Sequence, residues 1–293
     1  AAQNIFCRYL IVNKQNSLYS LNQFAEKYIV QRFLPDSETR SDLLYKIEKN
    51  TRKAQSELQS MQNDVNNNES LKRLIADWNI ITDGDKISAA RAFGLYRRVA
   101  SDCQRGSKFH IESAMREAID EINKIEKNTM HPYVRFQKAR IYQKINETKI
   151  LSENLEYKML DAYEEVIWVI KNNPIYDSIR GTKSYPSVLW LYGTQLLSID
   201  NEEKIILAIR YLEEAKKSFE QLAIEDNEYY QCFTRLGYAY LSLYEKDHRK
   251  YITYLRKSRS VSNQLYGLRV KYNKKIRRYS IELHNKLLKY GQF

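Results

Sequence analysis

Residues 233–240, FTRLGYAY, decide the fold of this 293-residue chain. Phe233, Leu236 and Tyr240 recur at intervals of three and four, which places apolar side chains on one face of a helix. Gly237 stands within this segment, although a glycine inside a helix costs about 1 kcal/mol relative to alanine. Such a glycine is tolerated if a neighbouring helix must approach closely.

Three earlier segments share this arrangement. Their small residues are Gly94, Ala139 and Gly193, and the four copies are separated by 45, 54 and 44 residues. A second helix is predicted after each segment, with small or apolar residues at relative positions 0, 4 and 7. These sets are Ala118, Ile122 and Ile125; Ala162, Val166 and Val169; Ala208, Leu212 and Ala215; and, in weaker form, Tyr251, Leu255 and Ser258. The spacing lays one stripe along each helix and predicts interlocking helix pairs.

The composition also favours an all-α fold. The chain has only 8 glycines and 4 prolines, whereas sheet proteins need frequent turns built from these residues. Hydrophobic residues make up 43%, which is enough for a sizeable core. The 24 tyrosines can each place a ring against the core and leave the hydroxyl at its edge.

The helix pairs resemble the tetratricopeptide repeat, which has an aromatic residue, Leu, Gly and Tyr in its first helix and Ala, an aromatic residue and Ala in its second. The matching residues are Phe233, Leu236, Gly237 and Tyr240, with partial matches at Leu189, Gly193, Leu196, Ala208 and Ala215. The resemblance implies a right-handed α-α superhelix. The spacing, however, exceeds the standard 34 residues, and the terminal proline is missing.

The sequence pattern of residues 1–35 predicts a short β-hairpin followed by a helix. Residues 6–12 are strand-like, 13–17 are polar, and 18–21 can return, while Pro35 ends the following helix. This segment resembles the end of the winged-helix domain in STAND-type signalling ATPases, a family that includes antiviral and transcription-regulating members. The resemblance implies that the chain is the sensor region of a larger protein, with the ATPase upstream. The alternative is an ordinary hairpin that covers the first helix.

We therefore expect four segments. Residues 1–35 are the winged-helix-like remnant, 36–85 are connecting helices, 86–265 are irregular repeat pairs, and 266–293 are a basic C-terminal capping helix. The last of the connecting helices is expected to end near a turn at residues 83–85.

The positive charge is concentrated at the C-terminal end. The chain has a net charge of +12, and residues 246–293 hold 14 basic and 2 acidic residues, so the remainder is neutral. The candidate anion-binding residues are Arg256, Lys257, Lys271, Lys274, Lys275 and Arg278. A nucleic acid or an acidic protein is one possible partner for this surface. A solvated helix face with no partner is the other interpretation.

The leading functional prediction is a protein-recognition scaffold that binds a protein or peptide, including upstream domains of the same protein, in a groove lined by the first helices. The candidate groove residues are Trp190, Tyr192, Gln195, Arg235, Tyr238 and Tyr240. The alternative prediction is a nucleic-acid-binding module that uses the basic C-terminal helices.

No catalytic, cofactor or metal site is expected. Three cysteines and four histidines are scattered without ligand spacing, and the phosphate-loop-like residues 181–184, GTKS, lack the preceding glycine of that motif. The absence of a signal-peptide pattern and of a run of about 18 apolar residues predicts a cytoplasmic protein with no membrane partner.

Overall fold

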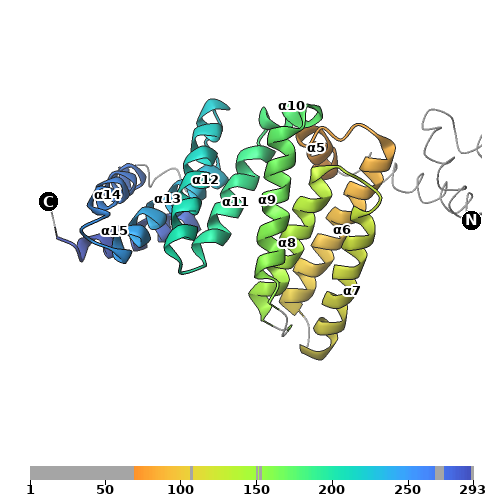
Figure 1. Ribbon diagram of the computed structural model, residues 1–293, viewed down its shortest axis with the longest axis horizontal. Helices are drawn as coiled ribbons and strands as arrows, with labels where there is room; N and C mark the ends of the chain where they lie inside the picture. Colours follow the sequence, from red (N-terminus) through yellow and green to blue (C-terminus); the bar gives the residue numbers. More distant parts are fainter. Residues whose placement is uncertain (1–68, 106–107, 150, 152–153, 268–273, 292–293) are drawn as a thin grey trace, which may run out of the picture. The chain divides into compact units, whose positions relative to one another are not determined.

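The computed structural model describes residues 69–105, 108–149, 151, 154–267 and 274–291. Within these ranges every regular element is a helix (Figure 1). The elements are α5 Glu69–Asp77, α6 Asp83–Arg105, α7 Lys108–Glu126, α8 Pro132–Thr148, α9 Glu156–Asn172, η2 Pro174–Tyr176, α10 Asp177–Arg180, α11 Ser184–Leu197, α12 Glu202–Gln221, α13 Asn227–Lys246, α14 Ile252–Gly267 and α15 Lys274–Leu288. The predicted hairpin and its following helices, up to residue 68, lie outside the described residues.

The chain divides into two compact units, Ala1–Glu69 and Ser70–Phe293. The division falls inside the segment 36–85, which was expected to form connecting helices. Trp78, just after α5, is buried in the core of the second unit and packs against Tyr133 and Phe136 at ring-centroid distances of 5.1 and 5.0 Å. Residues from Ser70 onward are therefore part of the helical stack.

The four predicted helix pairs are confirmed as α6 with α7, α8 with α9, α11 with α12, and α13 with α14. Every member of the predicted second-helix stripes is buried, including the weaker set at Tyr251, Leu255 and Ser258. Ser258 is accommodated in the core because its hydroxyl donates to the carbonyl of Gly237 at 2.8 Å. Complementary stripes of small and large side chains thus build one continuous core.

The longest repeat spacing has a local cause. Between α9 and α11 the chain inserts the short helices η2 and α10, and the buried side chain of Ile179 anchors them. The Asn173 side chain accepts from the Ile175 amide at 3.1 Å and so begins η2. The 54-residue spacing between Ala139 and Gly193 contains this insertion.

The expected turn at residues 83–85 is wrong, because Asp83 to Asp85 form the first turn of α6. Thr82 is the N-cap: its hydroxyl oxygen accepts from the Asp85 amide at 3.1 Å and donates to the Asp85 carboxylate at 2.6 Å. The bond from the Asp85 amide is one half of a capping box, while the Asp85 carboxylate accepts from the Thr82 hydroxyl and not from the Thr82 backbone N–H. The Thr-x-x-Asp spacing is the sequence signal that could have predicted the start of this helix.

The tyrosines join helices across the layers. Buried Tyr185, Tyr240 and Tyr251 donate to Glu214, Glu213 and Glu202 on α12 at 2.5, 2.6 and 2.5 Å. Each ring fills the core while its hydroxyl reaches a carboxylate at the edge, as the composition predicted.

The three glycines of the repeat segments differ in their surroundings. A Cβ atom on Gly193 would lie 2.8 Å from Leu212 Cγ, and one on Gly237 would lie 2.5 Å from Leu283 Cδ2. Gly94 is exposed, and no atom lies within 4 Å of the position its Cβ would take. The expected close approach therefore exists at Gly193 and Gly237 and not at Gly94.

Replacing Gly94 with alanine is expected to stabilise the protein by about 0.5–1 kcal/mol, because the helix interior gains an alanine and loses no packing. Urea unfolding monitored by circular dichroism measures the change. A loss of stability in Gly94→Ala would show that α6 meets a neighbour at this position.

Candidate ligand-binding groove

A groove with a volume of ≈ 660 Å³ opens on the second unit. It is lined by residues of α5, α6, α8, α11 and α13, so first helices of all four pairs contribute to it. Its buried floor is formed by Trp78, Tyr133, Phe136 and Gln137. Phe93 and Trp190 are half-buried and complete its aromatic lining.

One wall of the groove is held in place by contacts between distant parts of the chain. The Thr182 hydroxyl donates to the carbonyl of Asp77 at 2.7 Å and so ties the end of α5 to the segment before α11. Figure 1 shows α5 beside α10 at this end of the helices. The residues that resembled a phosphate loop, 181–184, thus connect two helices and fix the groove wall.

The polar rim of the groove is internally paired. Lys183 contacts the carboxylates of Asp226 and Glu228 at 2.5 and 3.4 Å, and Ser187 donates to Glu228 at 2.5 Å. Asp226 also accepts from two backbone amides at the start of α13, and together with Lys183 these lower the pKa of its carboxyl against the effect of burial. The Arg140 guanidinium donates to the Tyr96 hydroxyl and stacks on the Tyr96 ring.

Two polar atoms of the groove residues have no hydrogen-bond partner. They are Gln137 Oε1 and Trp190 Nε1, and both are shielded from solvent. Gln137 is 2% exposed, and its Nε2 donates to the Tyr133 hydroxyl at 2.7 Å. Whichever way the amide is oriented, one of its two polar atoms lacks a partner.

The six predicted groove residues are spread over several sites, and Trp190 lines the groove just described. Tyr192 is 1% exposed and packs between Tyr163 of α9 and Tyr211 of α12. Gln195 is half-buried on α11, outside the lining of this groove.

The remaining three lie on α13. Tyr240 lines a second cavity of ≈ 340 Å³ between α12, α13 and α14. Arg235 lies 5.6 Å from the ring centroid of Tyr279, and Tyr238 donates to the Tyr279 carbonyl at 3.2 Å. Both therefore contact the capping helix α15.

Most of the groove lining was absent from the prediction, which drew its residues from α11 and α13 alone. Phe136 and Trp190 occupy the same position in their repeats, three residues before Ala139 and Gly193. This shared position in the repeat is the sequence signal that could have identified Phe136 as a groove residue. Nothing local in the sequence places Trp78 beside α8.

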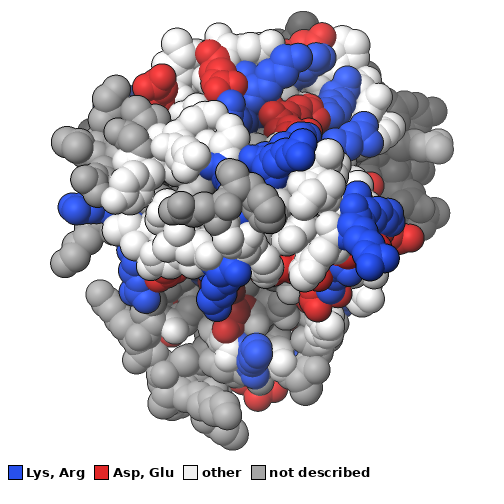
Figure 2. Space-filling model, turned by 90° about the vertical axis from the view of Figure 1, so that its left-hand side faces the viewer, with Lys and Arg blue, Asp and Glu red and all other residues white. Residues whose placement is uncertain are grey.

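Figure 2 shows the C-terminal end of the helices, where basic side chains of the described residues lie among acidic and uncharged ones. Of the predicted anion-binding residues, Arg256, Lys257 and Arg278 are exposed. Lys257 contacts Glu213 at 3.4 Å, and Arg278 contacts Glu282 at 2.8 Å. Lys271 and the side chains of Lys274 and Lys275 lie outside the described residues.

Acidic residues at the start of α12 offset part of the C-terminal charge. Lys246 contacts Asp200 at 2.5 Å, and Lys250 contacts Glu202 at 2.8 Å. Charges that look segregated along the sequence are thus partly paired in space.

The described residues contain no group of three His, Cys, Asp or Glu side chains placed to hold a metal ion. In the same part of the chain, no helix is both long and apolar enough to cross a membrane. No protein-family model matches the chain, and comparisons with curated proteins and with solved structures give no match either.

Proposed function

We propose that this chain is a non-catalytic protein-recognition scaffold that binds a segment of a partner protein in the groove between α5, α8 and α11. The observation that carries the proposal is an open, aromatic-floored groove to which four helix pairs contribute. Rigid helices present the aromatic side chains, and buried aromatic residues are the side chains that most often dominate binding energy. The groove volume of ≈ 660 Å³ lies within the range of ligand-binding pockets.

The finer architecture is part of the same proposal. Packed pairs with small-residue stripes support a right-handed, tetratricopeptide-like superhelix that acts as the sensor or regulatory module of a larger signalling ATPase. Upstream domains of that protein are then candidate partners. The free thiols of Cys103 and Cys232 support a reducing, cytoplasmic setting.

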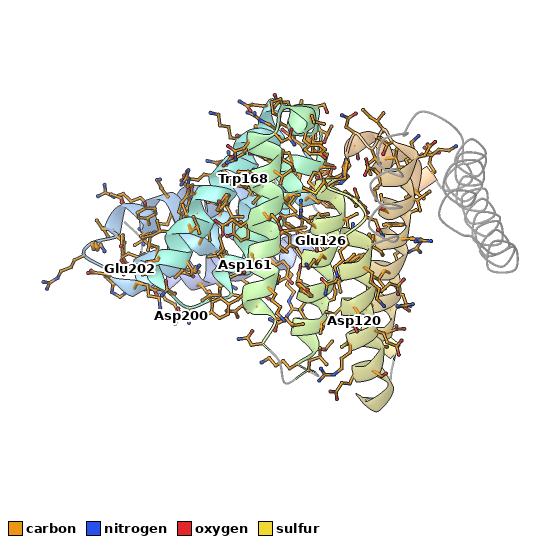
Figure 3. All side chains as sticks on the ribbon, turned by 45° about the vertical axis from the view of Figure 1, so that its right-hand side comes forward. Asp120, Glu126, Asp161, Trp168, Asp200 and Glu202 are labelled. Carbon is orange, nitrogen blue, oxygen red and sulfur yellow. The ribbon has the colours of Figure 1, made fainter. Side chains whose placement is uncertain are left out.

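Replacing Trp190 with alanine is expected to weaken binding of groove-selected peptides at least 30-fold, because a central aromatic side chain typically contributes about 2 kcal/mol or more. Peptides are selected from a displayed random 12-residue library with the wild-type protein, and their affinities are measured by calorimetry. Trp168→Ala is the matched control, since Trp168 is 63% exposed on α9 (Figure 3). Selection of no peptide, or equal loss in both variants, would count against the proposal.

The second candidate function is binding of an anionic polymer at the C-terminal end, favoured by the exposed side chains of Arg256, Arg277 and Arg278. A salt titration with a 20-base-pair DNA duplex tests it. A charge-driven complex must weaken steeply as salt rises, and Arg256→Glu must lower the slope by roughly one. Absence of binding at about 50 mM salt would exclude this function.

A further inference from the structure

Arg140 lines the groove and differs from two other cations of α8 in the partners of its side chain. Arg135 contacts Glu126 and Glu165 at 3.2 and 3.0 Å, and Lys138 contacts Glu126 at 2.6 Å. Arg140 is also half-buried, but among the residues that the structure describes it contacts no carboxylate. A charge that is partly removed from water is usually paired, because the loss of hydration is costly. The charge of Arg140 is therefore available to an anionic ligand.

The Arg140 guanidinium lies beside the aromatic floor of the groove. Its Nη2 donates to the Tyr96 hydroxyl, and the group lies 3.9 Å from the ring centroid of Tyr96 and 5.6 Å from that of Phe136, a floor residue. Burial raises the pKa of the Tyr133 hydroxyl, also at the floor, and the positive charge of Arg140 acts on it in the opposite direction. A guanidinium has several N–H donors in a planar fork, so those not used by Tyr96 can bond to a group that enters the groove.

The two carboxylates that line the groove lie under the influence of another cation. Lys183 contacts Glu228 at 3.4 Å. Burial raises the pKa of the Asp77 carboxyl, while the charges of Lys183 and Arg73 lower it. These residues belong to α5, to the segment just before α11 and to the first turn of α13. Opposite charges are thus balanced at that wall of the groove, whereas Arg140 gives the α8 wall an uncompensated positive charge.

We propose that the groove binds a peptide segment of a partner protein in which an Asp or Glu side chain pairs with the Arg140 guanidinium and a neighbouring apolar side chain packs against Phe93 and Trp190. This inference rests on the proposed function and specifies the chemistry of its ligand. A carboxylate complements a guanidinium because its two oxygens accept from two parallel N–H groups. The half-buried rings of Phe93 and Trp190 supply the apolar surface beside it.

The surroundings of Arg140 favour this pairing in two ways. The hydroxyl and ring of Tyr96 hold the guanidinium in place before a ligand arrives, so that less side-chain freedom is lost on binding. The aromatic floor excludes water from one side of the pair, and a charge-assisted hydrogen bond is stronger where water is partly excluded.

Peptides selected with the wild-type protein are expected to share an Asp or Glu next to an apolar residue. In the tightest 12-residue peptide each acidic residue is then replaced by its amide, Asp by Asn or Glu by Gln. One replacement is expected to weaken binding to the wild-type protein about 10-fold, the loss of a hydrogen-bonded charge pair, when affinities are measured by calorimetry. The same replacement is expected to have no further effect in Arg140→Gln.

This double-variant cycle separates pairing from general damage, because a destabilised groove would weaken the acidic and the amide peptides equally. Arg210→Gln is the matched control, since Arg210 is exposed on α12 and lies outside the lining of the groove, and it should keep full affinity for both peptides. If Arg140→Gln does not fold, Arg140→Lys replaces it. Lysine keeps the charge and lacks the fork, so the amide replacement must cost less in Arg140→Lys than in the wild-type protein.

The outcomes distinguish this inference from the proposed function on which it rests. Selection of no peptide overturns both. Peptides that lose affinity in Trp190→Ala but carry no acidic residue leave the groove as the site and overturn the pairing with Arg140. The same conclusion follows if every acid-to-amide replacement costs as much in the Arg140 variant as in the wild-type protein.

Discussion

Replacing Gly193 with alanine is expected to destabilise the protein by about 1–3 kcal/mol, because the added methyl group overpacks the contact between α11 and α12. Its Cβ would lie 2.8 Å from Leu212 Cγ and 3.2 Å from the Ala208 carbonyl oxygen. Leu212→Ala alone is expected to cost about 2–5 kcal/mol, since its buried side chain leaves a cavity. The free energy of unfolding in urea measures both changes.

The double variant separates close packing from general damage. In a Leu212→Ala background, Gly193→Ala is expected to be neutral or stabilising, because the methyl group enters the vacated space and alanine favours the helix by about 1 kcal/mol. Leu288→Ala, at a 53% exposed position, is the control and should change stability by less than about 0.5 kcal/mol. Additive effects of the two core substitutions would contradict the described helix contact.

Alkaline pH is expected to unfold the protein through its buried tyrosines. Burial raises the pKa of the Tyr133 and Tyr163 hydroxyls, and it raises that of Tyr238 to about 12. The pKa of these hydroxyls is higher in the folded protein than in the unfolded protein, where it is about 10. Their contribution to the free energy of unfolding is therefore complete below about pH 10 and is lost as the pH rises above it. Each fully buried tyrosine that keeps its proton contributes a loss of about 1.4 kcal/mol per pH unit in that range.

Tyr163→Phe isolates one such group. Its free energy of unfolding is expected to fall less steeply between pH 10 and 11.5 than that of the wild-type protein, by about 1.4 kcal/mol per pH unit. Tyr157→Phe, at a 69% exposed position on α9, should leave the slope unchanged. Equal slopes in Tyr163→Phe and the wild-type protein would show that Tyr163 ionises without unfolding.

The sequence was informative about helix pairing and uninformative about the groove, for a physical reason. Pairing depends on local period, and the stripes at Ala118, Ala162 and Ala208 are all buried as predicted. The groove depends on contacts between distant segments, such as Thr182 with Asp77 and Trp78 with Tyr133. Tyr192 shares a helix with Trp190 and yet faces the core, because two residues along a helix turn the side chain to another face.

The distribution of charge along the sequence predicts where basic residues are in excess, and it does not predict which of them are paired. The excess of basic residues beyond position 246 is a property of the sequence, but its pairing with Asp200, Glu202 and Glu213 follows from the packing of α12 beside α13 and α14. A linear charge count cannot contain that information.

The central claim is that the groove between α5, α8 and α11 is the binding site. The most direct test is a ¹H–¹⁵N spectrum of tryptophan-labelled protein with and without a display-selected peptide, with the three indole signals assigned by single replacements. The Trp190 indole signal is expected to shift strongly and the Trp168 signal to stay in place. A shifted Trp168 signal with an unchanged Trp190 signal would contradict the account.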